Sequence, residues 1–412
     1  GGGGGGGGGG YLFTLDHVRL LTLLVLLPAF FMLRKQAGTL PFGRTWPDKL
    51  LTLHIVLSAL LHLRETTLTD TLRQMLYLFT DVFLPYYVAS RALKQLNEFK
   101  DAMLAFALAA MVLALIGIFE YSRHWLLYSS LIDVMGLNWG MSNYLGRGGS
   151  LRASASTGQA IVLGYVISVA IGFYLFLRAG VRSRLQQRLG ALLLVAGLFS
   201  TLSRGPWVGA ALIITVFIAT GRNAVKRVML LGLAGVLAIP LLSIIPGGNK
   251  LIDLLPYIGT IEKGNITYRE ELLTNSIIVI KRNPLLGSID FLSTPEMQSM
   301  IQGEGIIDIV NTYLFVALKS GLIGLALFAG FFIAIALGIY KSFRTFQDKD
   351  DETLRLGRAL LATLAGVLLT ITTVSSISVI PVVYWSVAGL GVAYIQMVRN
   401  LRSSRATHPA TR

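Results

Sequence analysis

Long apolar runs recur from one end of this chain to the other and restrict its fold more than any other feature. A helix that crosses the hydrocarbon layer of a membrane, roughly 30 Å thick, needs about 17–25 apolar residues. Because lipid offers no hydrogen-bond partners, such segments satisfy their backbone groups internally, as helices. We place the runs, some of them short, near residues 18–33, 50–63, 75–90, 102–119, 161–177, 189–203, 206–221, 228–245, 313–340, 357–376 and 380–398. The sequence therefore predicts an all-α, polytopic membrane protein with about eleven visible transmembrane helices.

The composition excludes a soluble globular protein. Charged residues make up 14% of the chain and apolar residues 54%, whereas a soluble domain has roughly 25% charged residues. The net charge of +15 is ascribed to cytoplasmic loops and to contacts with anionic membrane lipids or pyrophosphate. No basic stripe interleaved with aromatic residues predicts nucleic-acid binding. Cysteine is absent, which excludes disulfides, thiol nucleophiles and thiolate metal sites.

The orientation in the membrane follows from Lys and Arg, which favour the cytoplasmic side. They cluster in alternate connections, so the others are expected on the periplasmic side of a bacterial inner membrane: 64–74, 120–160, 203–206, 246–312 and 376–380. The predicted organisation is transmembrane helices over 11–245 with a periplasmic loop at about 120–160, a periplasmic loop domain over 246–312, C-terminal transmembrane helices over 313–398 and a cytoplasmic tail over 399–412.

The first ten residues are all glycine. We interpret Gly1–Gly10 as placeholders for residues whose identity was not assigned and exclude them from fold reasoning. The charge pattern places Asp16 and His17 outside and the C-terminus inside. A twelfth span upstream is therefore expected in the intact chain, with both termini in the cytoplasm.

Arginine on the expected periplasmic side is the strongest indication of chemistry. Arg152 ends the first long loop, Arg204 lies in a tight turn between two spans, and Arg269 lies in the second long loop. An arginine at membrane depth is costly unless it is paired, and a guanidinium suits bidentate binding of phosphate oxygens. Two or three converging arginines would bind a lipid-linked pyrophosphate. The alternative is that each snorkels to headgroups or, for Arg269, pairs with Glu270 or Glu271.

Other polar features are interpreted as structural. Residues 268–282 are expected to form an amphipathic helix that Pro284 ends, with Leu272, Leu273, Ile277 and Ile280 at helical spacing. His54 and His62, on one span, are expected at helix interfaces, and the acidic run Asp348–Glu352 is expected to be a helix-capping turn. The sequence contains no zinc-binding His-Glu-x-x-His and no Walker loop, so neither zinc hydrolysis nor ATP use is predicted.

Three motifs in order carry a family resemblance. They are Leu202-Ser-Arg-Gly-Pro-Trp-Val-Gly209, the Arg269 helix followed by Asn283-Pro-Leu-Leu-Gly287, and Asn311-Thr-Tyr-Leu314 followed by Gly321-Leu-Ile-Gly-Leu325. Together they resemble the O-antigen ligase and polysaccharide polymerase (Wzy-type) superfamily of bacterial membrane glycosyltransferases. The resemblance covers roughly residues 150–340. It implies a twelve-span fold of GT-C type that moves a glycan from undecaprenyl pyrophosphate to an acceptor hydroxyl, without nucleotide or metal.

One position departs from the family pattern. Ligases that attach O-antigen to lipid A-core commonly carry His-Asn before the Tyr-Leu run, and that His is proposed to activate the acceptor hydroxyl. Here the position is Val310. Glu304 and Asp308 become the candidates for the general base, because a partly desolvated carboxylate can take a proton from a sugar hydroxyl. The alternative is that both only cap or hydrate the loop.

The predicted site combines these residues. Arg204 and Arg269, with Glu304 or Asp308, are expected to be catalytic, and the expected substrate-binding residues are Arg152, Arg147, Asn311, Tyr313, Trp125 and Tyr128. Aromatic residues of the first loop, which include Trp139, either stack on sugar faces or anchor the loop at the interface.

The missing His favours a polymerase, whose acceptor is another lipid-linked repeat unit, over a ligase whose acceptor is lipid A-core. A transporter or flippase of lipid-linked glycans is a more distant alternative, disfavoured because no inverted repeat or membrane-embedded acidic coupling residues are visible. The expected partners are the lipid-linked oligosaccharide, the acceptor glycan, membrane lipids and other polysaccharide-assembly proteins, and nucleic acid is not among them.

Overall fold

The computed structural model describes residues 16–129, 134, 146–147, 149–244, 263–301, 305–377 and 379–407. The chain divides into two compact units. The first comprises Gly1–Ala92, Gly264–Gly338 and Ile371–Ala393, and the second comprises Leu93–Lys263, Ile339–Thr370 and Tyr394–Arg412. In the part of the chain that the structure describes, the strands are limited to one short hairpin, β1 (Gly146–Arg147) and β2 (Ser150–Leu151). The prediction of an all-α membrane protein is confirmed.

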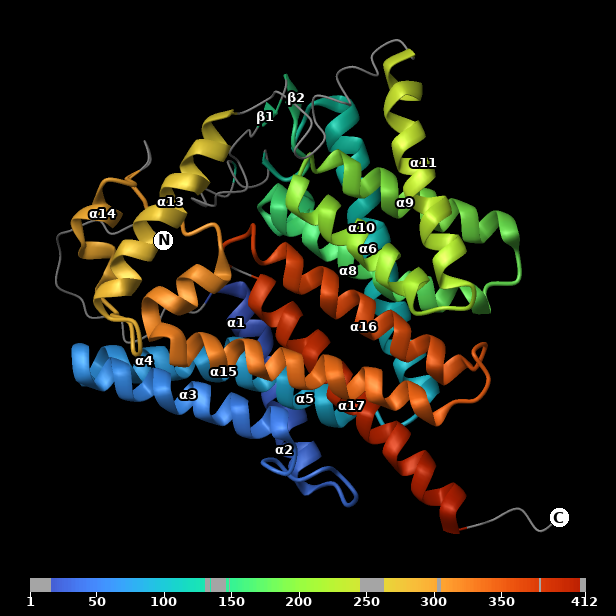
Figure 1. Cartoon of the computed structure of the whole chain (residues 1–412), viewed down its shortest axis with the longest axis horizontal. Coiled ribbons are helices and arrows are strands. Elements are labelled where there is room, and N and C mark those ends of the chain that lie inside the picture. Colours follow the sequence, from blue (N-terminus) through green and yellow to red (C-terminus); the bar gives the residue numbers. More distant parts are fainter. Residues whose placement is uncertain are drawn as a thin grey trace. The chain divides into compact units, whose positions relative to one another are not determined.

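The first unit joins helices from three parts of the sequence (Figure 1). Its elements are α1 (His17–Leu21), η1 (Thr22–Leu26), α2 (Leu27–Lys35), α3 (Trp46–Glu65), α4 (Leu68–Leu78), η2 (Phe79–Phe83), α5 (Leu84–Ala92), α13 (Lys263–Arg282), η6 (Phe291–Ser293), α14 (Pro295–Gln298), and the starts of α15 (Thr312–Ser342) and α17 (Val379–Thr407). The π-turns η1 and η2 continue the helices on either side. Helix α3 begins where Thr45 and Asp48 cap each other reciprocally, with Pro47 in the first turn.

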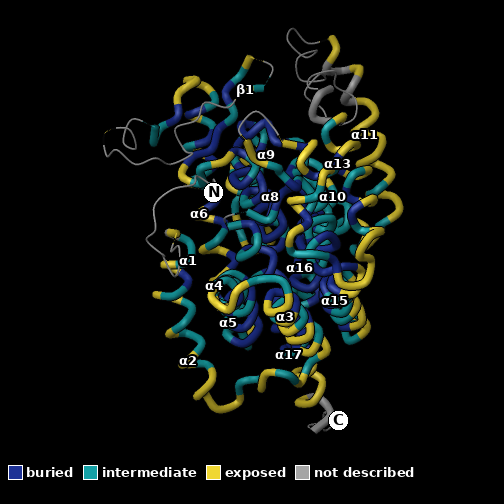
Figure 2. Tube along the Cα trace, turned by 90° about the vertical axis from the view of Figure 1, so that its left-hand side faces the viewer, coloured by how far each residue is buried: buried dark blue, intermediate teal, exposed yellow. Residues whose placement is uncertain are grey.

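The second unit packs around α8. Its elements are α6 (Leu96–Arg123), the β1–β2 hairpin, η4 (Ala155–Thr157), α8 (Ala160–Leu177), η5 (Arg178–Gly180), α9 (Arg184–Ser200), α10 (Arg204–Ala219), α11 (Ala224–Ile244), η7 (Phe343–Thr345), α16 (Glu352–Thr370) and the ends of α15 and α17. Figure 2 shows α8 mostly buried and α11 mostly exposed. Glycines bring the helices close: a Cβ on Gly172 would lie 2.1 Å from the Thr363 hydroxyl, and one on Gly197 would lie 2.3 Å from the Ala114 Cβ. Small residues at such crossings are typical of membrane helices.

Burial separates helices that face protein from helices that face lipid. The most apolar window of α8 is 83% buried, whereas that of α6 is 28% buried. The exposed side of α6 carries a stripe of large apolar residues at helical spacing: Leu104, Leu108, Val112 and Leu115. Among the described residues, five helices are long and apolar enough to cross a membrane, namely α6, α8, α15, α16 and α17. Each predicted span falls on a helical segment, and the total number of spans remains a prediction.

Two local expectations need correction. Helix α13 forms as predicted but starts at Lys263, and its buried face differs: Leu272 and Val279 are buried, whereas Leu273 and Ile277 are 47% and 41% exposed. The predicted span 313–340 is not one continuous helix, because Gly321 has φ 65° and ψ −170° and interrupts α15.

The acidic run before α16 acts as the expected capping turn. The Asp351 carboxylate accepts hydrogen bonds from the amides of Thr353 at 2.7 Å and Leu354 at 3.2 Å. Glu352 pairs with Lys100 at 3.0 Å.

Candidate functional site

Two of the predicted arginines lie at the turn between α9 and α10, residues 201–203. Arg152 donates from Nε to the Thr201 carbonyl at 3.4 Å and from Nη2 to the Ser203 hydroxyl at 3.0 Å. Arg204 follows as the first residue of α10. Segments about fifty residues apart in sequence therefore bring Arg152 and Arg204 to one turn of the second unit.

A third predicted arginine reaches this turn from the hairpin. Arg147, on β1, donates to the Leu202 carbonyl. Leu202 is fully buried and has a φ of 46°, in the left-handed region that side chains rarely adopt. Backbone strain of this kind concentrates at functional sites. The strained turn and its arginines are therefore the part of the second unit that we consider as a substrate site.

Glu120 holds the loop that carries Arg147 and Arg152. Its carboxylate is fully buried at the end of α6 and accepts hydrogen bonds from the amides of Leu127 at 3.1 Å, Ser154 at 2.9 Å and Ala155 at 2.8 Å. Three amide donors satisfy a buried carboxylate without a cation. Both ends of the loop are thereby fixed to α6, next to the strained turn.

Arg269 and Asp308 belong to the first unit. Arg269, exposed on α13, donates to the Thr373 carbonyl at 3.3 Å, and the Asp308 carboxylate accepts from the Ser375 hydroxyl. The Asp308 carbonyl also accepts from the Tyr268 hydroxyl at 2.9 Å. The structure therefore brings these two predicted residues to the same connection between α16 and α17.

The remaining predicted residues have local partners or fall outside the description. Asn311 caps α15, because its Oδ1 accepts from the amides of Tyr313 at 2.9 Å and Leu314 at 3.2 Å. The Tyr313 ring lies 5.8 Å from that of Phe328. In the second unit, Trp125 is 47% exposed and packs edge-on against Phe119, while Tyr128 is half-buried. Glu304 and Trp139 lie outside the described residues.

The second and third family motifs dock on each other in the first unit. The segment 284–288 crosses the break in α15: Ser288 donates its amide to the Leu318 carbonyl at 2.9 Å, and Leu322 donates to the Pro284 carbonyl at 2.8 Å. Both Gly287 and Gly321 have a φ of 65°. A Cβ on Gly321 would lie 2.2 Å from the Leu285 carbonyl oxygen. Glycine at these positions is therefore required for the two segments to approach.

The same segment is tied to α3. Glu65, which follows the predicted span 50–63, accepts from the amide of Ile289 at 2.6 Å and from the Ser288 hydroxyl at 3.4 Å, and it pairs with Arg64. Burial acts to raise the pKa of Glu65, but the hydrogen bonds from Arg64 and Ile289 outweigh it and lower the pKa. The charged carboxylate therefore helps to hold the docked segment at the end of α3.

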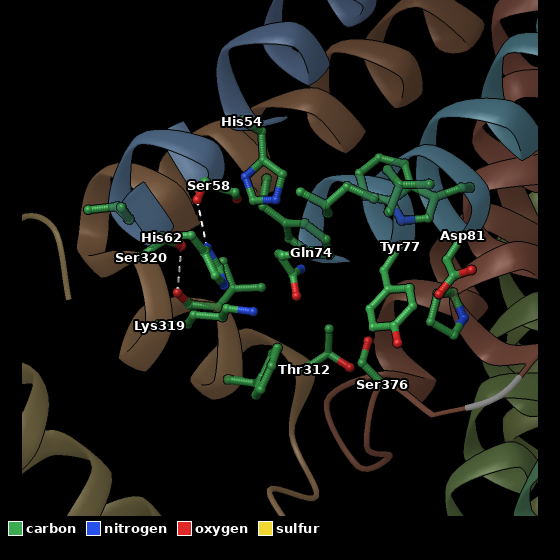
Figure 3. Close-up of a pocket in the computed structure, with 18 of the residues that line it drawn as sticks. His54, Ser58, His62, Gln74, Tyr77, Asp81, Thr312, Lys319, Ser320 and Ser376 are labelled. Carbon is green, nitrogen blue, oxygen red and sulfur yellow. Dashed lines mark hydrogen bonds between the residues drawn. The ribbon is translucent and has the colours of Figure 1, made fainter. Parts of the chain in front are cut away.

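Beside the break in α15, the first unit encloses a cavity of about 160 Å³ (Figure 3). Helices α3, α4, α15 and α17 and the connection before α17 contribute its walls. Its polar lining consists of His54, Ser58, His62, Gln74, Tyr77, Asp81, Thr312, Lys319, Ser320, Ser376 and Tyr384. Ser376 follows the residue that binds Asp308, so the cavity adjoins the Arg269 and Asp308 region of this unit.

Sequence reasoning missed this cavity. His54 and His62 are indeed at a helix interface, with the His54 ring 6.0 Å from that of Phe328, but both also line the cavity. The spacing of eight residues places the two histidines on one side of α3, and this spacing could have indicated that they share a site. Nothing in the sequence indicated that Lys319 lines a cavity, because only tertiary contacts show which face of α15 does so.

A comparison with known families supports the resemblance. Residues 189–329 match the family model described as O-antigen ligase. The match runs from α9 into α15 and includes Arg204, Arg269 and both docked glycines. No curated protein matches the chain. The match implies a multi-pass membrane enzyme of the O-antigen ligase or polymerase type. Residues 189–329 are therefore similar to the O-antigen ligase family, which agrees with the resemblance that the three motifs indicated.

Proposed function

We propose that this protein is an inverting glycosyltransferase on the periplasmic face of the inner membrane, which transfers a glycan from undecaprenyl diphosphate to an acceptor hydroxyl. The observation that carries the proposal is the turn 201–203, where Arg147 and Arg152 donate hydrogen bonds directly before Arg204. Guanidinium groups bind phosphate oxygens in a fixed geometry. The family match over this turn supports the same chemistry.

The reaction needs positioning and charge stabilisation more than covalent catalysis. The acceptor oxygen attacks the anomeric carbon from the face opposite the diphosphate, a new glycosidic bond forms, and the old carbon–oxygen bond breaks. The diphosphate leaves with the bonding electrons, and the arginines offset its growing charge. The hydroxyl proton passes to a carboxylate, for which we propose Asp308, with Glu304 as the alternative. Arg269, bonded to the same connection as Asp308, completes the proposed set.

We propose a polymerase, in which the acceptor is another lipid-linked repeat unit. The absence of His at position 310 favours this acceptor over lipid A-core. The family description favours the ligase, which is therefore the second candidate. The two candidates share the donor and the arginines and differ only in the acceptor.

The test is a transfer reaction with purified protein and defined acceptors. A polymerase lengthens lipid-linked repeat units when they are the sole substrate. A ligase leaves them unchanged and joins them to added lipid A-core. Elongation in the first reaction supports the polymerase, and transfer only in the second replaces it with the ligase.

Arg204→Ala tests the role of the arginines for either acceptor. We expect the rate to fall roughly 100-fold or more, since loss of one donor to a developing negative charge has about that effect. The matched control is Arg222→Ala, because Arg222 follows the other end of α10 and its side chain is 67% exposed. An Arg204→Ala variant that transfers glycan as fast as the control variant contradicts the proposed mechanism.

A further inference from the structure

The cavity of the first unit contains a cation that has no counter-ion among the described residues. Lys319 extends into it from α15, about two turns inside the helix start, with its ammonium group directed at the cavity (Figure 3). The centre of the Phe315 ring lies 5.6 Å from the ammonium nitrogen. A weak aromatic contact does not neutralise the charge of this half-buried ammonium group.

The carboxylates near the cavity are already paired. Asp81 is the only acidic side chain among the described residues of the lining, and Arg19 binds it at 2.9 Å. Beyond the lining, Glu65 accepts from Arg64 and Ile289, and Asp70 pairs with Arg73 at 2.8 Å. The charge of Lys319 is therefore left for a ligand to balance.

Two histidines add hydrogen-bonding groups around Lys319. His54 is 9% exposed and lines the cavity. His62 lies 2.7 Å from the Ser58 carbonyl through Nδ1. Because a carbonyl only accepts, that nitrogen carries the proton, and in the neutral ring Nε2 is unprotonated and accepts a hydrogen bond from a ligand hydroxyl.

We propose that this cavity binds an oxyanion of the substrate, with Lys319 as its counter-ion and the unprotonated Nε2 of His62 as the acceptor for a hydroxyl of the same substrate. The oxyanion is either a phosphate of a lipid-linked diphosphate or the carboxylate of an acidic sugar. A cavity of about 160 Å³ has room for one phosphate or carboxylate group. Which molecule carries the oxyanion rests on the proposed function, whereas the existence of an anion site does not.

Binding to purified protein in detergent micelles tests the site. The probes are farnesyl diphosphate and glucuronic acid, with farnesol and glucose as their uncharged counterparts. Lys319→Met should raise the Kd of one anionic probe roughly ten- to hundredfold, the usual worth of a hydrogen bond to a charged group. Lys341→Met is the matched control, since Lys341 lies on the last turn of α15 and is exposed, and it should bind as the wild type does.

The outcomes separate the sources of the anion. Loss of farnesyl diphosphate binding assigns the site to the donor, and loss of glucuronate binding assigns it to an acidic sugar. The proposal is overturned if the Lys319→Met variant binds both anionic probes as the wild type does. It is also overturned if the uncharged probes bind the wild type as tightly as the anionic ones.

A second measurement uses the wild-type protein and does not depend on how the variant folds. The anionic probe should protect Lys319, more than Lys341, from an amine-acylating reagent, as peptide mass spectrometry would show. Equal labelling of Lys319 with and without both probes overturns the proposal. Protein that binds the anion but transfers no glycan contradicts only the proposed function.

Discussion

The first unit contains a buried cation and a half-buried one in opposite circumstances. Arg91 is fully buried and bound by Asp48, whose two carboxylate oxygens each lie 2.9 Å from Nη2, and Tyr86 donates to the same carboxylate at 2.8 Å. Arg91 also donates to the Leu40 carbonyl at 3.2 Å. Lys319 instead extends into a cavity whose one described carboxylate is already paired.

The difference distinguishes a structural charge from a functional one. Burying an ion pair is tolerated when both charges and their hydrogen bonds are satisfied. The Asp48 and Arg91 pair meets that condition with its own residues, so it has nothing left for a ligand. Lys319 does not meet it, and a charge left open in a cavity is typical of a binding site.

The largest expected effect comes from breaking the satisfied pair. Asp48→Ala leaves the Arg91 guanidinium buried without a counter-charge and removes an acceptor from Tyr86. We expect the free energy of unfolding to fall by about 3–5 kcal/mol, measured by chemical unfolding in detergent micelles.

A double variant tests whether this loss comes from the uncompensated charge. Asp48→Ala combined with Arg91→Met removes both charges and should be more stable than Asp48→Ala alone, because no unpaired charge remains buried. If the double variant loses the sum of the two single losses, the pair is not coupled and the contrast with Lys319 fails.

The next largest effect should come from the break in α15. Gly321→Ala forces a Cβ to within 2.2 Å of the Leu285 carbonyl oxygen at a φ of 65°. We expect a loss of about 2–3 kcal/mol in unfolding free energy, since the strain and the backbone clash act together. Proteolysis should also become faster in the segment 283–301, which docks on the break.

The matched control lies in the same helix. A Cβ on Gly330 would meet the Leu50 side chain at 3.9 Å, an ordinary contact. Gly330→Ala should therefore be neutral or stabilise by up to about 1 kcal/mol. Equal losses for the two variants would mean that the break in α15 is not a specific structural requirement.

The sequence predicted the features that depend on local pattern. Apolar runs gave the helical segments because a membrane span is defined by length and composition. Three ordered motifs, around Arg204, Gly287 and Gly321, indicated the resemblance to the O-antigen ligase family. Such motifs can be recognised from residue types and their order alone. The sequence likewise indicated that Arg152 and Arg204 matter, and the structure places both at one turn.

The cavity was not predictable because it depends on tertiary contacts. Lys319 lies on the same face of α15 as Thr312 and Phe315, and only tertiary contacts decide that this face lines a cavity. The inward face of α13 was misjudged for a related reason: Leu273 is as apolar as Leu272, and only packing decides which is buried. Partners distant in sequence decided each of these cases.

The smallest expected effect is the one that most sharpens the comparison. Lys319→Met replaces the ammonium group with an apolar chain of similar length, in a cavity where Phe315 and Phe328 already supply apolar surface. Because no carboxylate among the described lining residues loses its partner, we expect the unfolding free energy to change by less than about 1 kcal/mol. Arg91→Met, which strands Asp48, should lose several times more.

Thermal and chemical unfolding of Lys319→Met and Arg91→Met, side by side in the same detergent, measures this difference. If Lys319→Met destabilises as strongly as Arg91→Met, Lys319 has a structural partner, and its charge is not held open for a ligand. If it unfolds like the wild type, the ammonium group adds nothing to the fold. A charge in a cavity that adds nothing to the fold is the result expected of a ligand-binding residue.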